Sequence, residues 1–84
     1  MQPEQSEEER ACTELQRRAD RIAGLIVASD YPAIDLAIEI RKLREFVETS
    51  LPGRRGLFRM IYESRFRRLW EQFRRQEDGE LPGW

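Results

Sequence analysis

A run of aromatic and basic residues from 53 to 78, GRRGLFRMIYESRFRRLWEQFRRQED, limits the folds open to this 84-residue chain. Its apolar residues recur at helical spacing, and at about 100° per residue they cover an arc of roughly 220° on a helical wheel. A surface helix that lies on one neighbour needs an arc of only a little over about 100°. The run therefore predicts a helix that contacts two neighbours, or one neighbour and a second copy of the chain.

Two further helices are predicted before this run. Ser6 with Glu9 three residues later is a capping-box pattern, and apolar residues then recur at steps of three and four up to residue 26. This pattern predicts a first helix over residues 6–28. A second helix is predicted over residues 32–50, and it should end near Leu51 because Pro52 disfavours helical geometry at the residue before it.

The predicted fold is all-α, a single domain over residues 1–84 with helices at 6–28, 32–50 and 54–78 packed as an up-down-up bundle. No stretch alternates in the manner of a strand. Residues 1–5 and 80–84 are expected to be flexible tails. The predicted core comprises Leu15, Ile22, Ile26, Leu36, Ile40, Leu43, Val47, Phe58, Ile61, Tyr62, Phe66, Leu69 and Phe73.

The residue types argue against catalysis. The chain has no histidine, so the commonest general base and metal ligand is missing, and its one cysteine cannot form a disulfide within the chain. Cys12 lies on the apolar side of the first helix, where a thiol behaves as a small hydrophobic residue. No Gly-rich phosphate loop is present. We therefore expect a protein that is not an enzyme and has no catalytic residues, cofactor or metal site.

The sequence also gives expectations about location. The first ten residues, MQPEQSEEER, are acidic and lack the apolar run of a signal peptide. The longest apolar patch, residues 22–28, is too short to span a bilayer. Binding of the last helix to a membrane surface is disfavoured, because its apolar side is needed to cover the other two helices. We expect a soluble, cytoplasmic protein with no membrane partner.

More apolar side chains are present than three short helices can easily cover. Ile34 and Ile38 lie on the side of the second helix away from its main apolar seam. Exposed apolar patches on small proteins mark partner sites. We therefore expect a protein–protein interaction or regulatory module, homodimeric or part of a larger assembly. Its predicted partner surface comprises Ile34, Ile38, Phe46, Met60 and Trp70. The alternative is that the tail, with Leu81 and Trp84, folds back over this surface.

Nucleic-acid binding is the competing prediction. The net charge of −1 divides into −4 for residues 1–50 and +3 for residues 51–84. Such asymmetry is compatible with a nucleic-acid face, and equally with attraction between two parts of one chain or between two chains. The candidate nucleic-acid contacts are Arg54, Arg55, Arg59, Arg67 and Arg74. The slight acidity of the whole chain and the glutamates Glu63 and Glu71 within the basic side count against this function.

Overall fold

The computed structural model describes residues 6–28 and 30–83, and within them every regular element is helical. The elements in chain order are α1 (Glu7–Ala28), α2 (Ala33–Ser50), the 3-10 turn η1 (Pro52–Arg54), α3 (Arg55–Phe58), the π turn η2 (Arg59–Glu63), α4 (Ser64–Phe73) and α5 (Arg75–Asp78). The predicted all-α class is confirmed.

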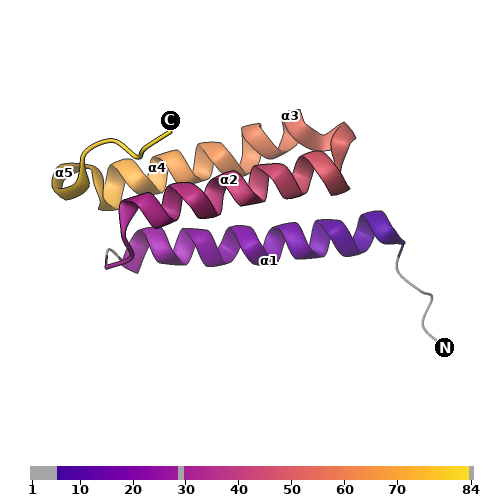
Figure 1. The fold of residues 1–84 in the computed structure, drawn as a ribbon, viewed down its shortest axis with the longest axis horizontal. Coiled ribbons are helices and arrows are strands. Elements are labelled where there is room, and N and C mark those ends of the chain that lie inside the picture. The colour runs from indigo at the N-terminus through magenta and orange to yellow at the C-terminus, as the bar shows by residue number, and fades with distance from the viewer. Residues whose placement is uncertain (1–5, 29, 84) are drawn as a thin grey trace.

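The helices lie side by side along the long axis of the molecule (Figure 1). Helices α1 and α2 run in opposite directions, and α4 contacts α1 while α3 contacts α2. After α5 the chain reverses direction, and residues 80–83 return along α4 and α2 (Figure 1). This return places the end of the described chain on the surface between two helices.

The first two helices have the boundaries that their end signals predict. The backbone N–H of Glu9 donates a hydrogen bond to Ser6 Oγ at 3.1 Å and caps α1. Helix α2 ends at Ser50, and the following Leu51 has φ −138° and ψ 57°, outside the helical region. Pro52 causes this break, since a proline ring disfavours helical geometry at the preceding residue.

The prediction of one continuous helix over residues 54–78 is wrong. The π turn interrupts it, and at Arg74 the backbone leaves helical geometry (φ −127°, ψ −25°) before α5 begins. On a straight helix, eight residues at about 100° each would set Phe66 about 80° away from Phe58. A π turn holds more residues per turn than an α-helix. It therefore reduces this offset, and both rings face the core.

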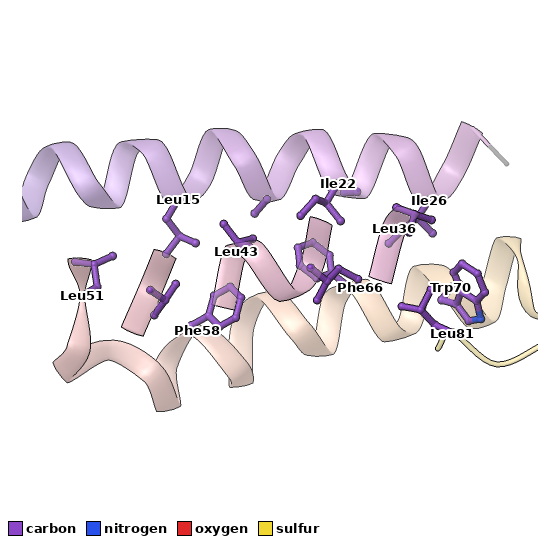
Figure 2. Packing of buried hydrophobic residues seen from close by; sticks show 14 residues of the cluster. Leu15, Ile22, Ile26, Leu36, Leu43, Leu51, Phe58, Phe66, Trp70 and Leu81 are labelled. Atoms are coloured by element: carbon purple, nitrogen blue, oxygen red, sulfur yellow. The ribbon is translucent and has the colours of Figure 1, made fainter. Parts of the chain in front are cut away.

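A cluster of buried hydrophobic side chains fills the space between the helices (Figure 2). Nine of the predicted core residues belong to it: Leu15, Ile22, Ile26, Leu36, Ile40, Leu43, Val47, Phe58 and Phe66. The small residues Ala19 and Ala23 are also buried, which lets α1 approach its neighbours closely.

Four predicted core residues differ from the prediction, all of them in the third helical segment. Ile61 and Phe73 are 47% and 44% exposed. Tyr62 and Leu69 are half-buried and pack against the edge of the cluster. The prediction places all these side chains on one regular helical wheel. The π turn instead rotates the residues that follow it about the helix axis relative to those that precede it. Trp70 faces the core in their place, 2% exposed.

Arg74 is buried where α4 ends, with 2% of its surface exposed. Its Nε donates to Asp78 Oδ2 at 2.8 Å, and its Nη1 and Nη2 donate to the carbonyl oxygens of Leu25 and Tyr31 at 3.3 and 2.5 Å. Its guanidinium carbon also lies 5.0 Å from the centre of the Trp70 ring. One side chain therefore joins the end of α1, the connection to α2 and the break before α5.

The chain after α5 is held against the helices. Trp70 Nε1 donates a hydrogen bond to the carbonyl oxygen of Gly79 at 2.8 Å. Leu81 is 3% exposed and lies beside Trp70 in the core (Figure 2). Residues 80–83, which we name the C-terminal tail, therefore lie against the helices, and the flexibility expected of residues 80–84 stays a prediction. Trp84 and residues 1–5 lie outside the described residues.

Two glycines give opposite predictions for the same substitution. Gly79 has φ 68°, which a residue with a Cβ adopts only with strain, whereas Gly24 lies inside α1 with no such φ. A Cβ would meet no atom within 4 Å at either position. We expect Gly79→Ala to lower the free energy of unfolding by about 1–3 kcal/mol, and Gly24→Ala to raise it by about 0.5–1 kcal/mol. Urea denaturation measures both changes, and a stabilised Gly79→Ala would contradict the reversal at this residue.

Candidate functional site

The C-terminal tail and the outward side of α2 form the two walls of a groove. It encloses about 310 Å³, and its lining comprises Ile34, Ala37, Ile38, Ile40, Arg41, Arg44, Leu81, Pro82 and Gly83. Ile34 and Ile38 remain 59% and 40% exposed within it. We refer to this feature as the α2–tail groove.

The pattern of α2 explains why the groove is apolar at one end. Ile34, Ile38 and Arg41 follow one another at i, i+4 and i+7, so they share one side of the helix. The neighbouring Ile40 is 1% exposed and belongs to the core, so it forms the floor of the groove. The groove therefore has an aliphatic surface at the start of α2 and guanidinium groups further along.

A second hollow continues the groove toward the π turn. It encloses about 400 Å³, and its lining comprises Arg44, Arg59, Glu63, Ser64, Arg67 and Gly83. Arg44 and Gly83 line both hollows, so the two form one surface. We refer to this second part as the arginine hollow.

The charges in the arginine hollow are unequal. The side chain of Glu63 is 12% exposed, accepts a hydrogen bond from Arg44 and lies 3.7 Å from Arg59. Among the described residues, three arginines, with Arg67 the third, and the carboxylate of Glu63 line the hollow. Arg59 and Glu63 are the first and last residues of the π turn. Such turns occur frequently at functional sites.

The structure separates the five residues of the predicted partner surface. Ile34 and Ile38 meet in the α2–tail groove, and Met60 is 67% exposed on the π turn. Phe46 is half-buried, with the guanidinium carbon of Arg18 4.5 Å from its ring centre. Trp70 is buried in the core, so its assignment to the partner surface is wrong.

The predicted partner surface does not include the C-terminal tail. The alternative prediction was that the tail folds back and covers this surface, and the tail does fold back, with Leu81 buried in the core. The tail nevertheless leaves Ile34 and Ile38 exposed, because it lies beside them as the second wall of the groove. Two residues of the sequence signal that the tail folds back: Gly79, where the chain reverses, and Leu81, the one aliphatic residue of the tail.

The arginines predicted to contact nucleic acid are used inside the chain. Arg55 lies 3.5 Å from Glu48, and Arg59 and Arg67 line the arginine hollow. Arg74 is buried and cannot reach a phosphate from its observed position, so its assignment as a nucleic-acid contact is wrong.

The charge asymmetry of the sequence also has a role within the chain. Arg54 donates two hydrogen bonds to Glu8 at 3.1 and 2.7 Å, which joins η1 to the start of α1. Arg65 lies 3.4 Å from Asp20, which joins α4 to the middle of α1. The acidic first half and the basic second half therefore attract each other across helix contacts.

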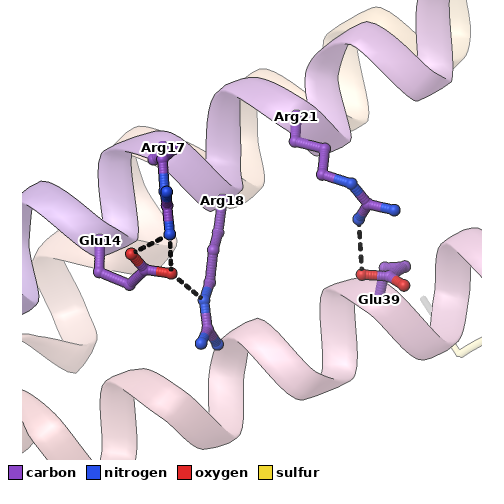
Figure 3. Close-up of polar contacts among 5 residues, drawn as sticks. All are labelled: Glu14, Arg17, Arg18, Arg21 and Glu39. Atoms are coloured by element: carbon purple, nitrogen blue, oxygen red, sulfur yellow. Dashed lines mark hydrogen bonds and ion pairs between the residues drawn. The ribbon is translucent and has the colours of Figure 1, made fainter.

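Polar contacts cover the side where α1 meets α2 (Figure 3). Glu14 accepts hydrogen bonds from Arg17 and Arg18 at 2.7 and 2.9 Å, and these bonds lower the pKa of Glu14 below its ordinary value of 4.5. Arg21 donates to Glu39 across the two helices at 3.0 Å. This side therefore offers paired charges, unlike the aliphatic wall of the α2–tail groove.

In the described ranges, 6–28 and 30–83, no three cysteine, aspartate or glutamate side chains gather as metal ligands would. None of the helices there is long and apolar enough to cross a membrane. Cys12 is partly buried and packs against the core.

No protein-family model matches the chain, and no curated protein or solved structure matches it.

Proposed function

We propose that this chain is a non-enzymatic helical module that binds another protein chain through the α2–tail groove. The observation that carries the proposal is the exposure of Ile34 and Ile38, 59% and 40%, within one groove. Single exposed apolar residues are ordinary on protein surfaces. Two large aliphatic side chains beside an aliphatic floor instead form a continuous patch of the kind that partners cover.

The size of the groove favours a protein partner over a small molecule. Its volume of about 310 Å³ is near the lower end of ligand pockets, which enclose about 300–1,000 Å³ and bury most of their ligand. Ile34 is more than half exposed, so this groove would leave much of a small ligand in water. A few side chains from a partner surface suit it better, because the partner backbone then covers the open side.

Site-specific photo-crosslinking tests this proposal. A photoreactive amino acid at position 38 lies in the groove, and one at position 57 is the control, since Leu57 is 42% exposed and does not line the groove. In cells of the native organism, position 38 should give a discrete protein adduct that position 57 does not give. An adduct of twice the chain mass would indicate self-association, and another mass a different protein. The absence of a discrete adduct at position 38 would contradict the proposal.

Binding to nucleic acid has less support. Of the five candidate arginines, Arg54 and Arg55 pair with glutamates of the same chain and Arg74 is buried. The net charge of −1 also gives little long-range attraction to phosphates. We expect no binding to duplex DNA when the protein is titrated at low salt. Binding that weakens steeply as salt is added would overturn this expectation.

A further inference from the structure

We infer that the α2–tail groove and the arginine hollow together bind an acidic segment of a different protein. In this complex, aliphatic side chains of the segment contact Ile34 and Ile38, and its carboxylates meet the arginines. The inference rests on the proposed function and adds the chemical class of the partner. It is carried by the continuity of the two hollows through Arg44 and Gly83.

The charges on this surface favour acidic groups. Arg41 and Arg44 line the groove, Arg59 joins Arg44 in the hollow, and Glu63 is the one carboxylate that the described residues contribute to either lining. Arg41 lies 3.8 Å from Glu45, but both side chains are more than 60% exposed. Water and salt screen such a pair, so a partner carboxylate displaces it at little cost. The local surplus of positive charge complements the carboxylates of an acidic segment in contact with it.

The spacing along α2 constrains the occupant. Ile34 and Arg41 are seven residues apart, which is about 10 Å along a helix at about 1.5 Å per residue. A helical segment would therefore carry its acidic residues about two turns from its aliphatic residues. An extended segment would need about three residues between them, at about 3.3 Å per residue. Either form presents an aliphatic part and an acidic part in a fixed order.

The start of α1 in a second copy of this chain does not supply such a segment. The acidic run at the start of α1 contains Glu7, Glu8 and Glu9, but the first large aliphatic residue after it, Leu15, is 6% exposed. Glu8 is already hydrogen-bonded to Arg54. This acidic run of a second copy therefore fits the surface poorly, and we assign the surface to a different protein.

Selection from a phage library of random 16-residue peptides tests the inference on the full-length chain. Enriched peptides should combine aliphatic residues with several Asp or Glu residues. Their affinity should fall about tenfold or more with Ile38→Glu, and about two- to fivefold with Arg41→Gln. Leu57→Glu and Arg68→Gln are the matched controls, since both residues are exposed and lie outside the two linings. Circular dichroism establishes that each variant is folded before it is compared.

The outcomes separate the inference from the proposed function. Peptides that need Ile38 but carry no excess of Asp or Glu would overturn the acidic class and leave a protein-binding groove in place. Peptides that bind Ile38→Glu as tightly as the wild type, or a library that yields no enriched peptide, would count against both. Acidic peptides that lose affinity with Ile38→Glu and Arg41→Gln, and keep it with both controls, would support both.

Discussion

Replacing Arg74 with alanine is expected to destabilise the fold by about 3 kcal/mol or more. The substitution leaves the carbonyl oxygens of Leu25 and Tyr31 without their donor and removes the partner of Asp78. At about 0.05–0.15 kcal/mol per residue, a chain of this length has only about 4–13 kcal/mol of total stability. The loss would therefore be visible as a large fall in the urea midpoint, or as an unfolded protein at room temperature.

The neighbouring Arg75 provides the control for this substitution. Its side chain is 56% exposed and lies 3.5 Å from Glu71, an arrangement that contributes little to stability. Arg75→Ala should therefore change the free energy of unfolding by no more than about 0.5 kcal/mol. Equal and small effects of the two substitutions would show that Arg74 is not buried among these carbonyls.

Phe66→Ala is expected to destabilise the fold by about 3–5 kcal/mol. The side chain of Phe66 is fully buried at 0% exposure, so its removal loses apolar burial and leaves a cavity. Phe73→Ala, on the same helix, should cost about 1 kcal/mol or less, because Phe73 is 44% exposed. Urea denaturation of both variants measures the difference.

This pair of phenylalanines tests the unequal burial of two residues on one side of α4. On a straight helical wheel, both rings belong to one apolar side. In the structure both lie on α4, and Phe66 is buried, whereas Phe73, the last residue of α4, is 44% exposed. Equal losses of stability for the two variants would contradict this arrangement.

The sequence predicts the first two helices well because their signals are local. The cap of α1, the break at Pro52 and the regular apolar seams each depend on residues within a few positions of one another. All seven predicted core residues on α1 and α2 are buried. The third segment was predicted less well, because no local signal marks the π turn that divides α3 from α4.

The contacts that hold the C-terminal end together are long-range, and periodicity carries no information about them. Arg74 finds its carbonyl partners 49 and 43 residues earlier in the chain. On a helical wheel Arg74 lies on the polar side among other charged residues, so its burial cannot be read from its position there. Trp70 lies at the edge of a wide apolar arc on the wheel, which predicts a partner contact, and its hydrogen bond to Gly79 forms only after the chain reverses.

The candidate site was predicted in part. Ile34 and Ile38 stand out in the sequence because they lie away from the main seam of α2, and both are exposed. The groove that joins them to arginines could not be predicted, since it needs the returning tail as its second wall. The arginine hollow likewise needs the π turn to place Glu63 beside Arg44.

Methyl NMR with a soluble paramagnetic agent tests most directly whether the groove exists as an open apolar surface beside a packed tail. At low protein concentration, the methyl signals of Ile34 and Ile38 should broaden strongly. Those of Ile40 and Leu81 should broaden little, because these residues are 1% and 3% exposed. Protected Ile34 and Ile38 methyls in a dilute monomer, or a strongly broadened Leu81, would contradict the account.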